Sequence, residues 1–337
     1  MAKVNKMIVL HIANLAWVGG VGNFISDFAC AFPEFQHQIL FLRDLNENYD
    51  YYKSFEERGI RAYHAPEITE ELIDGINPKI ICLHNPPETI YKKELKDLKI
   101  LQKTYTILFH HAKTKLFPNI DLDIYVSQWI ADAYKGFEKF IKKSKVVHPC
   151  VDAEPYLNIK REYIKKENVT VGRIQSNTNA HLGKFSEDVG MLKKLKNVDF
   201  FLVGDGYEKT DDKRFTFAPI KQGAMKNYLE KVDIFYVWGA KGHTESWSRV
   251  VTEAMLSGIP IVVKDNHDGL AEQVRKSKAG FLVNTEEEFL KTIQMLIDDP
   301  ELRKKHGELG RKWASENLTI KNLREALIDD MLQFGVN

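Results

Sequence analysis

Two glutamates in the second half of the chain, Glu245 and Glu253, are spaced so that they could hold hydroxyl groups of one ligand. Apolar residues recur at helical spacing over positions 247–255, and a Ser-Gly pair at 257–258 can end the helix. Glu245 then precedes the helix, and Glu253 lies on it. A carboxylate at Glu253 could accept hydrogen bonds from two vicinal ribose hydroxyls, and Glu245 could hold hydroxyls of a transferred sugar.

The beginning of this helix could seat a diphosphate. A helix N-terminus presents N–H groups without partners and a partial positive charge, and the backbone of Ser248, Arg249 and Val250 would supply both. The alternative is that both glutamates are solvated charges, which is the simpler interpretation of such a pair on an arbitrary helix. The rest of the chain favours a ligand site.

Short apolar runs rich in β-branched residues recur along the whole chain, as expected for strands buried on both faces of a parallel sheet. They are Met7–Ile12, Gln38–Leu42, Ile80–His84, Tyr105–Phe109, Ile124–Ser127, Lys145–His148, Val169–Arg173, Phe200–Gly204, Arg214–Phe217, Ile234–Trp238, Ile259–Lys264 and Phe281–Asn284. Between them lie segments with helical character, at Gly22–Phe32, Gln128–Phe140 and Ser186–Lys196. Alternating strands and helices predict an α/β fold with right-handed crossovers.

The chain has 337 residues, a length that suits two domains better than one. The pattern of strands and helices is interrupted near residues 150–168, where Pro149, Pro155 and a polar run occur. We therefore predict a first domain over residues 1–155 and a second over 165–315. The segment from residue 316 to 337 is predicted to be a helix that crosses back to the first domain.

The composition narrows the class of protein. The net charge of +1 shows no overall attraction to nucleic acid or membrane, although basic stretches leave an anionic acceptor or DNA possible. The three cysteines are far apart in the sequence, which favours a reducing compartment. No apolar run is long enough for a transmembrane helix, and the N-terminus resembles a buried strand more than a signal peptide. We expect a cytoplasmic protein.

Taken together, six segments resemble the retaining GT-B glycosyltransferases of the family-4 type (glycosyl transferases group 1). Glu245-x7-Glu253, followed by Ala-Met-x-x-Gly-x-Pro, resembles the family's donor-binding signature. The other five matching segments, in chain order, are Ile8–Gly22, Ile80–Pro87, Tyr105–His111, Val126–Trp129 and the opening of the second domain, where Val171-Gly172-Arg173 with Lys184, and Leu202–Gly206, match. The resemblance implies two facing Rossmann-like domains with a deep cleft between them.

The resemblance also implies roles for residues at matching positions. Arg173 and Lys184 would clamp the donor diphosphate and stabilise the leaving group, as two fixed cations can do without a metal. Gly19 and Gly20 belong to a glycine-rich loop whose backbone would meet a phosphate. His110 is expected to be the histidine of the cleft, with His111 as the alternative. The remaining donor-binding positions are Gly204, His243, Ser246, Trp247, Ser248, Arg249, Val250 and Glu253.

Three features depart from the family pattern. Trp247 replaces a more frequent phenylalanine, and Ser248 replaces a frequent glycine. The loop between Arg173 and Lys184 is longer than expected, which weakens the match of Lys184. The N-terminal half is short, which suggests a reduced acceptor face.

The resulting prediction is a retaining glycosyltransferase that moves a sugar from a nucleotide diphosphate sugar, with UDP-sugar favoured over GDP-sugar, to an unidentified acceptor hydroxyl. The acceptor could be a glycan, a small molecule, a lipid carrier or a modified DNA base. Because no residue is an evident covalent nucleophile, a front-side transfer is expected. No cofactor or metal is expected, and Asp121 and Asp123, formally an Asp-x-Asp pair, are interpreted as a turn cap. A GT-B nucleotide-sugar epimerase, or a non-catalytic binder of nucleotide sugar or nucleic acid, remains the alternative.

Overall fold

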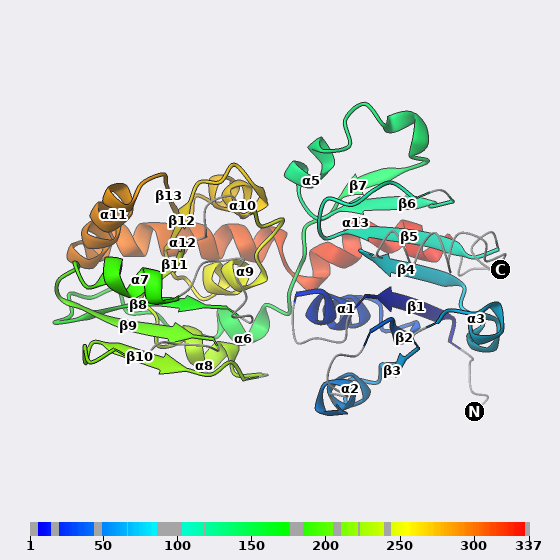
Figure 1. The fold of residues 1–337 in the computed structure, drawn as a ribbon, viewed down its shortest axis with the longest axis horizontal. Helices are drawn as coiled ribbons and strands as arrows, with labels where there is room; N and C mark the ends of the chain where they lie inside the picture. The colour runs from blue at the N-terminus through cyan, green and yellow to red at the C-terminus, as the bar shows by residue number, and fades with distance from the viewer. Residues whose placement is uncertain are drawn as a thin grey trace. The chain divides into compact units, whose positions relative to one another are not determined.

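The structure, a computed structural model, describes residues 6–14, 20–43, 49–65, 67–85, 103–117, 119–175, 185–204, 210–221, 223–238 and 244–333. The chain forms two compact units (Figure 1). The first unit comprises residues 1–150 and 320–337, and the second comprises residues 151–319. Each unit contains one sheet whose strands are all parallel. The predicted α/β fold class is confirmed.

The first unit is built on a seven-stranded sheet in the order β3-β2-β1-β4-β5-β6-β7. Its strands are β1 (Ile8–Ala13), β2 (Gln36–Phe41), β3 (Arg61–His64), β4 (Ile80–His84), β5 (Tyr105–His110), β6 (Leu122–Tyr125) and β7 (Ser144–Val146). Its helices are α1 (Gly20–Ala31), α2 (Tyr49–Glu56), α3 (Glu70–Ile76), α5 (Gln128–Asp132), the 3-10 helix η3 (Glu138–Phe140) and α13 (Ile320–Leu332).

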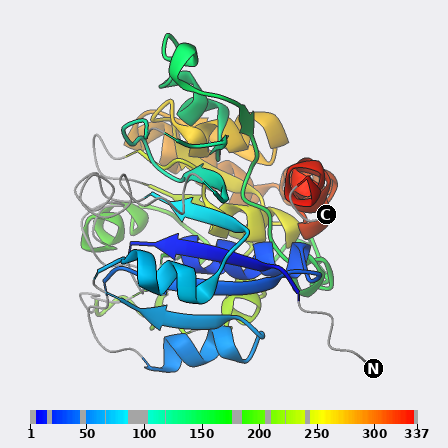
Figure 2. The same ribbon diagram turned by 90° about the vertical axis from the view of Figure 1, so that its right-hand side faces the viewer.

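One face of the first sheet is covered by α1 and α13, which pack against each other. The shared core contains Phe28 of α1, Phe109 of β5 and Leu327 of α13, none of them exposed. In Figure 2, α13 is the red helix seen nearly end-on. Asp330 of α13 is fully buried and accepts hydrogen bonds from Lys143 and Lys145 at the far edge of the sheet. The last helix of the chain is therefore part of the core of the first unit.

The second unit is built on a six-stranded sheet in the order β10-β9-β8-β11-β12-β13. Its strands are β8 (Val169–Ile174), β9 (Val198–Val203), β10 (Phe215–Ala218), β11 (Ile234–Val237), β12 (Ile261–Lys264) and β13 (Gly280–Val283). Its helices are α6 (Glu154–Leu157), α7 (Phe185–Leu192), α8 (Met225–Leu229), α9 (Arg249–Leu256), α10 (Gly269–Ser277), α11 (Glu286–Asp298) and α12 (Pro300–Asn317). The longest of these helices, α12, packs on α9, α10 and α11.

Close packing of α12 on the end of α9 requires glycine at two positions. Gly258 follows α9 with a φ of +73°, a conformation in which a side chain is strained. A Cβ on Gly307 of α12 would lie 2.2 Å from the carbonyl oxygen of Gly258. These two residues let the end of α9 approach the backbone of α12 closely.

One predicted helix is wrong in extent. The segment Gln128–Phe140 was expected to be a single helix, but α5 ends at Asp132 and the 3-10 helix η3 follows after a turn. Gly136 in this turn has a φ of +88°, which a right-handed helix does not allow. The short strand β3 was not predicted, because its four residues carry no continuous apolar run.

Candidate donor site

The beginning of α9 is held by side chains from the same helix and from α10. Ser248 caps the helix, and its Oγ accepts the N–H of Val251 at 3.4 Å. Gln273 of α10 accepts the N–H of Ser248 at 3.2 Å and donates to the Ser248 carbonyl at 3.1 Å. The predicted diphosphate seat included the N–H of Ser248, but in the structure this group is bonded to Gln273. The N–H groups of Arg249 and Val250, which follow in the first turn of α9, are the predicted groups that remain for binding a diphosphate.

Glu253 is a buried carboxylate one turn into α9, with only 3% of its surface exposed. Its Oε1 accepts hydrogen bonds from Arg249 Nε and from the hydroxyl of Tyr156, both at 2.9 Å. Arg249 comes from one turn earlier on the same helix, and Tyr156 comes from α6. These two donors compensate for the burial of the charge and hold the carboxylate in one orientation.

Glu245 precedes α9, and its surroundings favour its neutral form. Burial raises its pKa to about 7, hydrogen bonds from the N–H groups of Trp247 and Ser246 act in the opposite direction, and the charge of Asp268 raises it further. Asp268 also accepts the N–H of Glu245 at 2.8 Å and caps α10 through the N–H of Ala271. Near neutral pH, this carboxyl group can therefore both donate and accept hydrogen bonds.

The loop that carries Glu245 lies directly against the first residue of α10. A Cβ on Gly269 would be 1.7 Å from the carbonyl oxygen of Ser246, so only glycine fits. The N–H of Leu270 donates to the carbonyl of Glu245 at 3.1 Å. Trp247, 6% exposed, lies beside Trp313 of α12 with a ring separation of 6.5 Å. The position of Glu245 is thus fixed from both α10 and α12.

Arg173, the predicted clamp at the end of β8, is 1% exposed. Its guanidinium forms an ion pair with Asp188 of α7 and donates to Gln175 at 2.8 Å. The hydroxyl of Tyr236 on β11 donates to the same Asp188 oxygen at 2.9 Å. In this arrangement the guanidinium faces protein groups rather than solvent. Its role as a diphosphate clamp stays a prediction.

In the first unit, His110 is completely buried at the end of β5. Its Nε2 lies 2.7 Å from Asp123, and its Nδ1 lies 3.0 Å from the hydroxyl of Tyr134 and 3.2 Å from that of Thr114. Both ring nitrogens therefore have protein partners. His111, the alternative, is partly exposed. The role of His110 toward a substrate stays a prediction.

The other predicted positions are distributed over both units. Gly20 is the first residue of α1, and Gly204 follows β9 and donates its N–H to Ala218 at 3.0 Å. Gly19, Lys184 and His243 lie outside the described residues. Asp121 accepts the N–H of Thr106 at 2.9 Å, while Asp123 bonds to His110, so the two carboxylates serve different partners. Within the described part of the chain, no cluster of metal-ligating side chains occurs.

Several residues around α9 could not be identified from the sequence. Tyr156, Asp188, Asp268 and Gln273 contact the predicted site residues but come from other elements. Asp268 directly before an apolar stretch was a signal for a helix cap, although not for its bond to Glu245. The other three carried no signal, because their contacts depend on which helices become neighbours.

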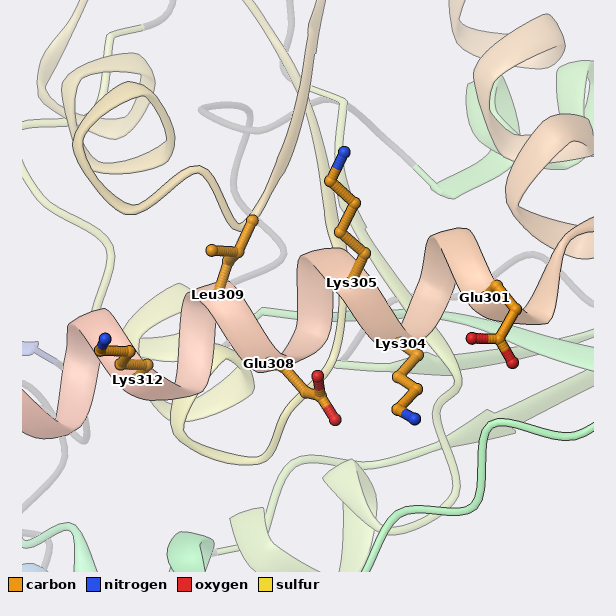
Figure 3. Close-up of a pocket in the computed structure, with 6 residues that line it drawn as sticks. All are labelled: Glu301, Lys304, Lys305, Glu308, Leu309 and Lys312. Atoms are coloured by element: carbon orange, nitrogen blue, oxygen red, sulfur yellow. The ribbon is translucent and has the colours of Figure 1, made fainter.

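A hollow on the surface is lined only by side chains of α12 (Figure 3). They are Glu301, Lys304, Lys305, Glu308, Leu309 and Lys312. None of them belongs to the predicted site. Figure 3 shows them projecting from successive turns of one helix, so we interpret the hollow as an ordinary helix surface. No helix among the described residues meets the length and hydropathy needed to cross a membrane.

Comparison with known proteins connects this geometry to a family. Residues 165–313 match the family model described as glycosyl transferases group 1. An uncharacterised glycosyltransferase of Haemophilus influenzae is 28% identical over 144 residues, which are 40% of this chain and 40% of that protein. The match thus spans well under half of that relative.

Solved structures resemble the whole fold. A glycosyltransferase from Rickettsia africae superposes with a TM-score of 0.76 at 14% identity, over 99% of this chain and 100% of its own. Anabaena HepE, crystallised with UDP and glucose, superposes with a TM-score of 0.75 at 15% identity, over 96% and 99%. The part of the resemblance that is confirmed is the match of residues 165–313 to glycosyl transferases group 1 and the two-sheet α/β fold shared with GT-B glycosyltransferases.

Proposed function

We propose that the chain is a glycosyltransferase that moves a sugar from a nucleotide diphosphate sugar to an acceptor hydroxyl, with retention of the anomeric configuration. The observation that carries the proposal is the beginning of α9, where the Ser248 cap lies between the titratable Glu245 and the buried Glu253. This segment belongs to the matched family region. We favour UDP as the nucleotide of the donor because Anabaena HepE was crystallised with UDP, and GDP is the second candidate.

In this proposal Glu253 binds the ribose of the donor. Its carboxylate is already oriented by Arg249 and Tyr156, so two ribose hydroxyls can donate to it without further ordering. The first turn of α9 then meets the diphosphate through its N–H groups. Glu245 precedes that turn and hydrogen-bonds the hydroxyls of the transferred sugar.

The leaving diphosphate gains negative charge during transfer, which fixed cations can stabilise. We propose Arg173 and Lys184 for this role, with the guanidinium of Arg173 shared between Asp188 and the diphosphate when the donor binds. Two cations would make a metal ion unnecessary. The donor's own phosphate oxygen would help to deprotonate the acceptor hydroxyl on the same face. A cytoplasmic location and the absence of a cofactor complete the proposal.

The decisive experiment measures thermal stabilisation and release of free nucleotide with a panel of UDP-sugars and GDP-sugars, with and without a chelator. A donor that binds only the folded protein raises its melting temperature. We expect one sugar nucleotide to stabilise the protein in the presence of chelator, and Glu253→Ala to abolish the effect. Glu286→Ala, which removes an exposed carboxylate of α11 paired with Lys194, should leave it intact.

The outcomes separate the competing functions. Nucleotide release that depends on an added acceptor, with the anomeric configuration preserved in the product, supports a retaining transferase. Free products formed without acceptor would indicate an epimerase, and binding without turnover would indicate a binding protein. Activity lost with chelator and restored by a divalent cation would overturn the metal-independent mechanism.

A further inference from the structure

Four histidines form a continuous chain of hydrogen bonds across the first sheet. His37 lies on β2, His11 on β1, His84 on β4 and His111 directly after β5. Neighbouring rings approach through their nitrogens at 3.2 Å for His37 and His11, 3.1 Å for His11 and His84, and 3.0 Å for His84 and His111. Their strands are adjacent in the sheet, so the chain runs perpendicular to the strands.

This chain lies in an apolar environment on the face of the sheet that α1 covers. His11, His37 and His84 are at most 4% exposed. Aromatic rings surround them: Phe28 meets His11 edge-on at 5.2 Å, and Phe109 stacks on His84 at 5.0 Å. Burying one positively charged imidazole here would be costly, so the neutral form of each ring is favoured.

One end of the chain determines where every proton lies. Nε2 of His37 lies 2.8 Å from the carbonyl oxygen of Phe32, which can only accept a hydrogen bond. His37 must therefore carry its proton on Nε2 and accept at Nδ1. A neutral imidazole has one donor and one acceptor, so His11 in turn must donate from Nε2 and accept at Nδ1.

The same rule passes along the chain to His84 and His111. His84 donates from Nε2 to His11, and its Nδ1 accepts from Nε2 of His111. Nδ1 of His111 is then left as a hydrogen-bond acceptor at the carboxyl end of β5. No hydrogen-bond partner for this nitrogen occurs among the side chains and backbone groups that the structure describes.

We propose that the histidine chain, anchored by the Phe32 carbonyl, fixes His111 as the neutral Nε2–H form, so that its Nδ1 is a permanent acceptor for a hydroxyl group of a substrate. Ligands of open parallel sheets bind at the carboxyl ends of the strands, where His111 lies. The proton positions do not depend on the proposed function, whereas the identity of the hydroxyl-bearing ligand rests on it.

The surroundings of the four rings support their neutral state. Burial, and then the neighbouring His110, lower the pKa of His111 to about 3. Burial lowers the pKa of His37 to about 4, where the Phe32 carbonyl and Glu34 act in the opposite direction and Lys6 adds to the lowering. For His11 and His84, burial is the main cause of a lowered pKa, and neighbouring imidazoles add to it. His111 is therefore an acceptor that orients a hydroxyl and is not a base that removes its proton.

The proton positions can be measured by long-range 15N–1H NMR of protein labelled at histidine, at neutral pH. The wild-type spectrum should show protonated Nε2 and unprotonated Nδ1 for all four rings. In His37→Phe the carbonyl anchor is lost, and His111 should become a mixture of its two neutral forms. His64→Phe, at an exposed histidine of β3, is the matched control and should leave His111 unchanged.

A wild-type His111 that is protonated at Nδ1, or doubly protonated, would overturn the proposal, and this measurement needs no variant to fold. An unchanged His111 in folded His37→Phe would also overturn it, because the anchor would then have no effect.

Turnover of UDP-glucose, followed by release of UDP, tests the hydroxyl contact. His111→Leu should lose about tenfold in kcat/KM, whereas His111→Asn, which retains an acceptor oxygen near the Nδ1 position, should lose clearly less. Equal activity of His111→Leu and wild type would show that no hydroxyl depends on this nitrogen. If wild-type protein releases no UDP, the proposed function fails for this donor while the NMR result stands by itself.

Discussion

At the scale of single residues, the candidate site is defined by two glutamates with opposite electrostatic surroundings. Glu253 accepts hydrogen bonds from the guanidinium of Arg249 and the hydroxyl of Tyr156. Glu245 is partly buried beside Asp268, and its pKa is raised to about 7. Glu253 thus has its hydrogen bonds from two fixed donors, whereas Glu245 changes its charge within the physiological range. Environment, and not residue type, separates the two roles.

The raised pKa of Glu245 makes the protein less stable at alkaline pH. The group favours the folded state fully below its ordinary pKa of 4.5, and this contribution is lost as the pH rises through about 7. Glu245→Gln removes this partly buried charge, so we expect it to stabilise the protein by roughly 2 kcal/mol at about pH 8 and little near pH 4. Thermal denaturation at both pH values measures this, with Glu308→Gln on the exposed face of α12 as control. Equal shifts at both pH values would contradict the assignment.

Tyr156 orients Glu253, and its removal should affect binding as well as stability. Tyr156→Phe deletes one hydrogen bond to the carboxylate, which should cost about 1 kcal/mol of stability and weaken donor binding several-fold. Tyr163→Phe is the matched control, because its hydroxyl donates to the Gly258 carbonyl at 2.6 Å in the same unit but does not touch Glu253. Comparable donor affinity in both variants, measured by calorimetry, would remove Tyr156 from the site.

At the scale of elements, the site depends on how α9, α10 and α12 pack together. Gln273 ties Ser248, the N-cap of α9, to α10, and Gly258 and Gly307 bring the end of α9 against α12. The loop that carries Glu245 is held by the cap of α10 through Asp268. A change that moves α10 should therefore move Glu245, even if it leaves the sheet intact.

Gly269→Ala tests this dependence. The added Cβ would overlap the carbonyl of Ser246, and because that atom belongs to the backbone, the loop must shift. We expect a loss of roughly 2–4 kcal/mol in stability and a marked loss of donor binding. Gly190→Ala on α7 has open space around its Cβ, so it should be neutral or stabilising by about 0.5–1 kcal/mol. Differential scanning calorimetry compares them, and a fully stable Gly269→Ala with normal donor binding would refute the packing argument.

At the scale of the whole molecule, the chain passes through both units and then returns to the first. The first unit consists of residues 1–150 and residues 320–337, so the last helix, α13, completes it. Leu323, Leu327 and Met331 of α13 are all fully buried in its core. Lys143 and Lys145 fix the end of that helix through Asp330. The first unit can therefore form its complete core only after the second has been synthesised.

Truncation of α13 side chains should destabilise the first unit selectively. Leu327→Ala leaves a cavity in a packed core and should cost about 2–5 kcal/mol. Leu332→Ala, at a leucine of the same helix that is 38% exposed, should cost less than about 1 kcal/mol. Hydrogen exchange followed by mass spectrometry reports each unit separately. Increased exchange in strands of the second unit with Leu327→Ala would contradict the assignment of α13 to the first.

The sequence by itself determined most of the strands, the parallel α/β class and the helix that carries Glu253. These features depend on local periodicity and on buried apolar runs, which are visible without knowing the neighbours. The turn after Asp132 was missed because a glycine with positive φ ended a segment of otherwise helical composition. The resemblance to the family was also recognisable, because six separate segments, among them the one from Glu245 to Glu253, match it in order along the chain.

Only the tertiary structure decided what each of these side chains meets. Arg173 was recognisable as a cation at a strand end, but its pairing with Asp188 depends on where α7 packs. The four histidines are separated by up to 73 residues between bonded neighbours, and only the strand order β2-β1-β4-β5 aligns them. Sequence patterns report what one segment buries, whereas hydrogen bonds between distant segments require the order and register of the sheet. For that physical reason the helix that carries Glu253 could be predicted, and the histidine chain could not.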